Sequence, residues 1–243
     1  MPSEPILLTS HESHVSAKNE VTYDGSAALY RRHAPARYAG NDVWLLPILA
    51  TLDSRPGARA LDVGSAVGTN SFYLAKHGYA VTGIESSSEM VSAARAASGS
   101  GGLDNRPRFI RQDFCTWVPD EPLFELVLAT AFVHLFTPPL DRDITDALLY
   151  HVAPGGAAII STTLEAQHSQ ALRSKLDSQN PAPGQPLSDL RWRNHYTRAT
   201  FRNLVERVAI GRFGATCTVE EHRSQDPERP EKVWSDIVVK RPS

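Results

Sequence analysis

Short apolar segments alternate with stretches whose apolar residues recur every three or four positions, from about residue 58 onward. The short segments predict strands, and the periodic stretches predict helices. Strands are expected over 58–63, 80–85, 108–112, 124–130 and 157–163, and helices over 70–77, 87–97 and 141–152. This alternation is typical of an α/β fold, in which helices cover the faces of a parallel sheet.

The two ends of the chain depart from this rhythm. Apolar and aromatic residues among arginines over 23–55 predict one or two amphipathic helices, broken near Pro35 and Gly40, and residues 1–22 read as a flexible polar tail. The proline-rich stretch 164–196 reads as an insertion. It is followed by an expected helix, 197–209, and two expected strands, 215–221 and 233–240. We expect a single domain over 23–243.

Local signals mark several of these boundaries. Gly78 follows the expected helix 70–77, where a left-handed residue often ends a helix. Ser86 and Glu89 have the spacing of a capping box just before the next helix. The segment Pro154-Gly155-Gly156 predicts a turn before the last parallel strand.

Composition and charge narrow the class of protein. The chain has 25 Lys and Arg against 27 Asp and Glu, and this net charge of -2 provides no general field that attracts nucleic acid or anionic lipid. No apolar stretch is long enough to cross a bilayer, and the polar N-terminus does not resemble a signal peptide. The two cysteines, Cys115 and Cys217, make neither a metal spacing nor a disulfide framework. We expect a cytoplasmic protein without a metal site.

Candidate chemistry begins in the segment Leu-Asp-Val-Gly-Ser-Ala-Val-Gly-Thr-Asn, residues 61–70, between an expected strand and an expected helix. Glycines there allow a ligand to approach the backbone, and the first N–H groups of the helix can donate to it. Glu85 ends the next strand, where a carboxylate can accept both hydroxyls of a ribose. These features together predict a site for a nucleotide-like ligand.

The spacing of the small residues distinguishes between nucleotides. A dinucleotide site would read Gly-x-Gly-x-x-Gly, whereas here Asp62 is followed by Gly64, Ala66 and Gly68. This segment resembles the first motif of the class I S-adenosylmethionine-dependent methyltransferases, acid-x-Gly-x-Gly-x-Gly, with alanine at the middle glycine. The resemblance extends from about residue 23 to 240. It implies a Rossmann-like doubly wound sheet, mostly parallel, with a C-terminal antiparallel strand pair and an N-terminal helical lid.

The resemblance also implies S-adenosylmethionine as cofactor and assigns residues to it. Asp62 and the loop from Gly64 to Gly68 would hold its amino acid part, Glu85 its ribose, and Met90, Asp113 and Phe114 its adenine. Further residues implied at the cofactor site are Ser65, Ala66, Asn70, Ser86, Thr130 and Tyr30.

His134 lies just past the fourth strand, in a segment that resembles the family's fourth motif. Because a sulfonium already activates its methyl group, positioning the acceptor can supply most of the catalysis, and no dedicated base is obligatory. Imidazole nevertheless titrates near neutral pH, so His134 is our candidate catalytic base or substrate orienter. The alternative is a histidine that belongs only to the wall of the site.

The acceptor would be enclosed by the lid, 23–55, and by the inserted substrate cap, 164–196. Candidate acceptor-binding residues with aromatic or imidazole rings are Tyr23, His33, Trp192, His195 and Tyr196. Tyr and Trp faces suit a flat ring, and arginines of the same segments could bind a carboxylate. We therefore expect a small aromatic or carboxylated acceptor, methylated at oxygen or nitrogen, as in specialised (secondary) metabolism. The oligomeric state, monomer or homodimer, stays open.

Three alternatives are weighed against this interpretation. A nucleic-acid methyltransferase would carry Asn- or Asp-Pro-Pro-aromatic directly after the fourth strand, and Thr137-Pro138-Pro139-Leu140 lacks both the acidic or amide start and the aromatic end. A protein with this fold could instead bind S-adenosylmethionine and catalyse a non-methylating reaction such as cyclisation, or act as a binding module. A nicotinamide enzyme is disfavoured by the glycine spacing.

Overall fold

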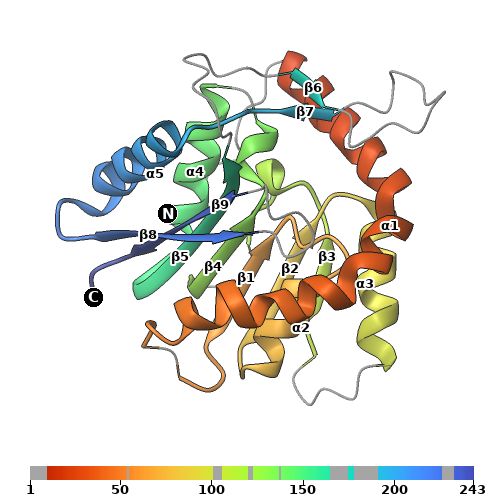
Figure 1. Cartoon of the computed structure of the whole chain (residues 1–243), viewed down its shortest axis with the longest axis horizontal. Coiled ribbons are helices and arrows are strands. Elements are labelled where there is room, and N and C mark those ends of the chain that lie inside the picture. Colours follow the sequence, from red (N-terminus) through yellow and green to blue (C-terminus); the bar gives the residue numbers. More distant parts are fainter. Residues whose placement is uncertain are drawn as a thin grey trace.

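A seven-stranded sheet with the order β3-β2-β1-β4-β5-β9-β8 forms the centre of the molecule (Figure 1). The computed structural model describes residues 10–53, 55–100, 106–119, 123–136, 138–164, 175–177, 191–225 and 233–243. The strands of the sheet are β1 (Arg59–Val63), β2 (Ala80–Glu85), β3 (Arg108–Arg111), β4 (Phe124–Thr130), β5 (Val152–Leu164), β8 (Thr218–Gln225) and β9 (Val233–Lys240). The first five pair in parallel, and β9 pairs antiparallel with both β5 and β8. The expected fold class is confirmed.

Helices cover both faces of the sheet because its strands are apolar on both sides. The helices are α1 (Ser10–Leu49), α2 (Thr69–Lys76), α3 (Ser88–Ser100), α4 (Leu140–Tyr150) and α5 (Arg198–Phe213). Two short 3-10 helices, η1 (Phe114–Thr116) and η2 (Val133–Leu135), follow β3 and β4. One core joins the sheet to α4 and α5, and the other joins it to α2 and the end of α1.

Helix α1 differs from the expected lid. It is a single 40-residue helix that contains both Pro35 and Pro47, and it begins at Ser10, within the stretch expected to be a flexible tail. A proline removes one backbone hydrogen bond but does not end a helix whose sides are held by packing. Ala27, Leu45 and Ile48 of α1 are buried. Figure 1 shows α1 curving beside α3 and then across α2, so tertiary contacts outweigh the helix-breaking residues.

The cap at the start of α3 differs from the expected capping box of Ser86 and Glu89. The hydroxyl of Ser87, not of Ser86, accepts the backbone N–H of Met90 at 3.2 Å. The helix begins at Ser88, one residue later than the pattern predicts, because Asp24 of α1 also accepts hydrogen bonds there. The expected left-handed Gly78 is confirmed, with φ of 89°.

Two further segments differ from expectation. Pro154-Gly155-Gly156 lies inside β5, where the pairing with β4 shifts register, so the segment is an irregularity of the strand and not a turn before it. Within the expected cap, β6 (Lys175–Asp177) and β7 (Arg191–Arg193) form an antiparallel pair. Within the expected cap, residues 165–174 and 178–190 lie outside the described residues.

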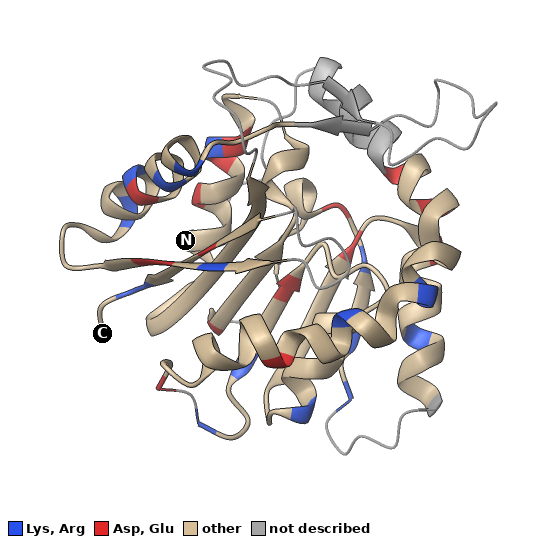
Figure 2. Ribbon diagram, in the orientation of Figure 1, with Lys and Arg blue, Asp and Glu red and all other residues tan. Residues whose placement is uncertain are grey.

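Charged residues are distributed over many elements. Figure 2 shows Lys and Arg interspersed with Asp and Glu along α5 and over several other helices. Within the described ranges, no helix combines the length and the apolar character that crossing a membrane would need.

Candidate active site

The order of the strands reverses between β1 and β4, and the loops after these strands diverge to opposite faces of the sheet. In doubly wound sheets, ligands bind at this point, outside the carboxyl ends of the strands. The segments that meet here are the β1–α2 loop, the end of β2 and the end of β4. The sequence-predicted cofactor residues lie mainly on these segments.

The β1–α2 loop adopts a left-handed backbone at three positions. The φ angles are 68° at Gly64, 48° at Ala66 and 84° at Gly68. A Cβ atom at Gly64 would lie 2.8 Å from the ring of Phe132, and one at Gly68 would lie 2.6 Å from the ring of Phe109. Both glycines are therefore required by conformation and by close packing. Ala66 stands where the motif has its middle glycine, and its positive φ is one that residues with a side chain rarely adopt.

Glu85 links the end of β2 to this loop. One carboxylate oxygen accepts the backbone N–H of Ala66 at 3.0 Å, and the other accepts that of Ser87 at 2.9 Å. Burial raises the pKa of Glu85 above its ordinary value, although these backbone hydrogen bonds oppose the shift. A partly buried carboxylate that is oriented by two N–H groups can accept further donors such as ribose hydroxyls.

Asp62 lies behind the loop, and its carboxylate accepts the hydroxyl of Ser71 at 2.6 Å. Burial, together with the negative charge of Glu85, raises the pKa of Asp62 to about 7. Two acidic side chains are thus held close enough for the charge of one to act on the other. Such an arrangement fits a cationic ligand, which would offset both charges.

Ser65 adds a polar atom to this region. Its hydroxyl oxygen is buried and has no hydrogen-bond partner among the described residues. Buried polar groups are nearly always satisfied, so an unpartnered hydroxyl beside the glycine loop suits a site that accommodates a polar ligand. The residues present therefore fit the expected cofactor.

A chain of side-chain amides connects α1, α2 and the end of β4. Asn41 donates to Asn70 at 3.2 Å, and Asn70 donates to Thr130 at 3.4 Å. Trp44, also on α1, donates to Asn41 at 2.8 Å and extends this series of hydrogen bonds along the helix. Asn70 and Thr130, both predicted at the site, are brought together.

The candidates for the adenine region lie farther along the same edge. Met90 is buried against Ala27 and Val67, and Tyr30 packs against this group. Asp113 accepts the backbone N–H of Cys115 at 2.9 Å, and Phe114 is buried with its ring 5.8 Å from that of Phe132. Ser86, in turn, contacts Glu85 through its hydroxyl at 3.5 Å. The structure thus groups Tyr30 with Met90, and Phe114 with the loop after β4.

His134 is a buried residue of η2. Its Nδ1 lies 2.9 Å from the hydroxyl of Thr162 on β5, and its backbone carbonyl accepts the N–H of Asn194 at 2.6 Å. The ring is 1% exposed. Its orientation is therefore set by the sheet, and a role in proton transfer stays a prediction.

The expected acceptor-binding residues lie on α1 and on the segment from β7 to α5. Tyr196 is buried, and its hydroxyl donates to Asp141 of α4 at 2.7 Å, which makes it a core residue. Tyr23 is half-buried on α1, with its ring 6.0 Å from that of Tyr30. His33 and His195 are also half-buried, and the side chain of Trp192 lies outside the described residues.

Sequence reasoning missed four residues that shape the site: Asp24, Asn41, Ser87 and Phe132. Asp24 and Asn41 lie on α1, and the amphipathic pattern expected over 23–55 does not identify which of its polar residues contact α2 and α3. Phe132 follows the fourth-motif strand, and its position there was a usable signal. Among the described residues, no group of His, Cys, Asp or Glu side chains has an arrangement that would hold a metal ion.

Comparison with known proteins supports the resemblance to a methyltransferase. Residues 60–156 match the methyltransferase domain family. The chain is 39% identical over 72 residues to a 23S rRNA (uracil(747)-C(5))-methyltransferase of Pyrococcus abyssi, which covers 29% of this chain and 18% of that protein. It is 34% identical over 104 residues to a trans-aconitate 2-methyltransferase of Rhizobium rhizogenes, which covers 42% of this chain and 37% of that protein. The chain therefore spans much less than two thirds of these curated relatives.

A solved structure extends the likeness of the fold to the whole chain. It is the 1,6-didemethyltoxoflavin-N1-methyltransferase of Burkholderia thailandensis, crystallised with 1,6-didemethyltoxoflavin and S-adenosylhomocysteine. The TM-score is 0.65 at 15% identity, with 100% of this chain and 94% of that chain covered. The fold, the glycine loop and the domain match confirm the resemblance. Residues 60–156 thus match a methyltransferase domain. The chain resembles the class I S-adenosylmethionine-dependent superfamily, whose cofactor is S-adenosylmethionine.

The strain at Ala66 predicts that Ala66→Gly stabilises the protein. A left-handed non-glycine residue costs about 1–2 kcal/mol, whereas the extra freedom of an unfolded glycine costs about 0.5–1 kcal/mol. We expect a net gain of about 0.5–1 kcal/mol, or a rise in Tm of about 1–4 °C, in calorimetry without ligand. Ala28→Gly, at an exposed position of α1, is the control and should lower Tm. A similar loss in both variants would contradict the strain at residue 66.

The raised pKa of Asp62 predicts a pH dependence of stability. The folded state binds this proton more tightly than the unfolded state, where aspartate titrates near 3.8. The contribution of Asp62 to the free energy of unfolding is therefore highest below pH 4 and falls as pH rises towards 7. Asp62→Asn, which still accepts from Ser71, should gain stability relative to the wild type between pH 5 and pH 8, by at least about 1 kcal/mol. Urea unfolding at the two pH values measures this, and parallel profiles would refute it.

Proposed function

We propose that this protein transfers the methyl group of S-adenosylmethionine to an oxygen or nitrogen atom of a small-molecule acceptor. One observation carries the proposal: Glu85, the left-handed glycine loop and buried Asp62 meet at the point where the strand order reverses. This combination suits a ligand with ribose hydroxyls and positive charge.

The residues of the chain divide the task of holding the cofactor. When bound, S-adenosylmethionine supplies a methyl group activated by its sulfonium. Glu85 would accept the ribose hydroxyls, and the N–H groups that open α2 would donate to the carboxylate of the amino acid part. Asp62, behind the β1–α2 loop, would interact with the ammonium group of the amino acid part. Met90 and Phe114 would flank the adenine.

The acceptor would lie between the end of β4 and two elements that are not part of the seven-stranded sheet. These elements are α1 and the β6–β7 pair, which contact each other. Holding the acceptor atom in line with the methyl group can supply about 7–11 kcal/mol of catalysis. A site covered by a helix and a strand pair favours a small molecule over a polymer, and we propose an aromatic or carboxylated metabolite. Methyltransferases named for trans-aconitate and for 1,6-didemethyltoxoflavin among the relatives support this class.

The experiment that tests the function measures binding first and chemistry second. S-adenosylmethionine and S-adenosylhomocysteine at about a hundredfold excess over Kd should add about 2.7 kcal/mol to stability. Incubation with methyl-labelled S-adenosylmethionine and a panel of small aromatic and carboxylic acids should then give S-adenosylhomocysteine and one labelled product. Binding without turnover would indicate a binding module. Turnover without label in the acceptor would indicate a non-methylating reaction, and no thermal shift would overturn the cofactor.

We further propose that His134 accepts the proton of the acceptor, with its ring held by Thr162. Removal of a general base typically lowers turnover by about 10²–10⁴-fold. His134→Ala should therefore lower kcat by this amount and leave the Kd of S-adenosylhomocysteine within a few-fold of the wild type. Thr162→Val, which keeps the imidazole but removes its hydrogen-bond partner, is the matched control and should cost less. An unchanged kcat together with a lower Tm would show that His134 has only a structural role in the wall of the site.

A further inference from the structure

We propose that Asp24 of α1 is a positioning residue for the cofactor: it holds the loop after β2, and through that loop it orients the carboxylate of Glu85. The inference rests on the proposed function, because it assigns to Glu85 the role of binding the ribose. It goes further because it assigns the orientation of part of the cofactor site to a helix outside the central sheet.

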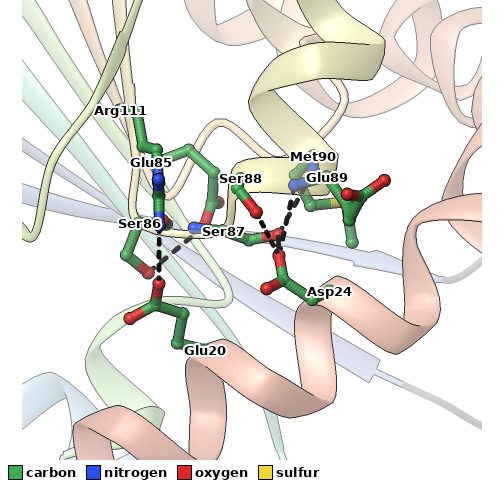
Figure 3. Close-up of polar contacts among 9 residues, drawn as sticks. All are labelled: Glu20, Asp24, Glu85, Ser86, Ser87, Ser88, Glu89, Met90 and Arg111. Carbon is green, nitrogen blue, oxygen red and sulfur yellow. Dashed lines mark hydrogen bonds and ion pairs between the residues drawn. The ribbon is translucent and has the colours of Figure 1, made fainter.

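The contacts of Asp24 converge on the start of α3 (Figure 3). One carboxylate oxygen accepts the hydroxyl of Ser87 at 2.6 Å and the backbone N–H of Glu89 at 3.2 Å. The hydroxyl of Ser88 lies 3.5 Å from the same oxygen. The pKa of Asp24 is lowered by the hydrogen bonds of Ser87 and Glu89 and by the charge of Arg111, which outweigh its desolvation. A negative charge at this end of a helix is also favoured by the helix dipole.

Ser87 transmits this contact to Glu85. Its side chain is held by Asp24 and also accepts the N–H of Met90, while its backbone N–H donates to Glu85 at 2.9 Å. The second oxygen of Glu85 accepts the N–H of Ala66 in the glycine loop. A continuous series of hydrogen bonds therefore runs from α1 through residue 87 to the carboxylate and on to the β1–α2 loop.

A second contact between α1 and this region is weaker. Arg111 at the end of β3 lies 3.4 Å from Glu20 of α1, and its guanidinium also donates to the carbonyl of Ser86 at 3.4 Å. The side chains of Arg111 and Glu20 are 56% and 37% exposed, and exposed ion pairs contribute little. Asp24, with short bonds to a buried serine, is the contact that determines the position of the loop.

Apolar packing keeps α1 in place independently of Asp24. Ala27, Tyr23 and Tyr30 of α1 pack against Met90 and Val67. Removal of the Asp24 carboxylate should therefore leave the helix docked but release Ser87. Glu85 would then lose the constraint on one oxygen, and the cofactor would have to restore it on binding.

The experiment measures the Kd of S-adenosylhomocysteine by calorimetry in Asp24→Ala and in a matched control, Asp42→Ala. Asp42 also lies on α1 and accepts a hydroxyl at 2.6 Å, but from Tyr73 of α2, away from the loop after β2. Coupling between connected sites is typically about 5- to 150-fold, so we expect Asp24→Ala to raise Kd at least about fivefold. The Kd of the Asp42→Ala control should stay within about twofold of the wild-type Kd.

A double-mutant cycle then separates positioning from a general effect on the fold. If Asp24 acts through Glu85, Asp24→Ala should have no further effect on Kd in a Glu85→Gln background. Asp24→Asn keeps the shape and one acceptor oxygen, so it should recover most of the affinity. If Asp24→Ala does not fold, Asp24→Asn serves as the test variant, and its Kd should lie between those of the wild type and Glu85→Gln.

The possible results are distinct. An unchanged Kd in Asp24→Ala, an equal loss in Asp42→Ala, or the same loss in the Glu85→Gln background would each overturn the role of Asp24 while leaving the proposed function intact. Failure of the wild type to bind S-adenosylhomocysteine would overturn the proposed function, and the inference with it.

Discussion

The structure depends on one constraint: the central strands of the sheet are apolar on both faces, so helices must cover both. Polar side chains that belong to these strands can then reach a ligand only where the strands end. Asp62, Glu85 and Thr130 all lie at or beside such ends, and the reversal of strand order between β1 and β4 opens space between the loops there. The location of the candidate site follows from the burial of the sheet.

This constraint also explains the electrostatics of the site. Acidic residues close to the sheet are desolvated, which raises the pKa of both Asp62 and Glu85. Each is stabilised locally, Asp62 by the hydroxyl of Ser71 and Glu85 by two backbone N–H groups. The protein thus maintains acidic groups at an unfavourable position, and a cationic ligand with hydroxyl donors would relieve that cost.

Helix α1 connects the periphery of the fold to this site. Its carboxylates, amides and rings contact α2, α3 and the loop after β2, through Asp42, Asn41, Asp24 and Tyr30. The sheet supplies the residues that resemble those of the superfamily, whereas α1 supplies contacts that set their orientation. Elements outside a conserved core are also where proteins of one fold acquire different substrates.

The sequence by itself determined the order and type of nearly all elements of the sheet, and strands 80–85, 124–130 and 233–240 coincide with those observed. Alternation of apolar segments and turn residues is a local signal, so it survives without knowledge of the fold. The glycine loop and Glu85 were predicted for the same reason, because their spacing is local. Only the tertiary structure decided that α1 continues through Pro35, that Ser87 and Asp24 cap α3, and that Tyr196 and His134 are buried. These features depend on contacts between residues far apart in the chain, whose energies are absent from any local pattern.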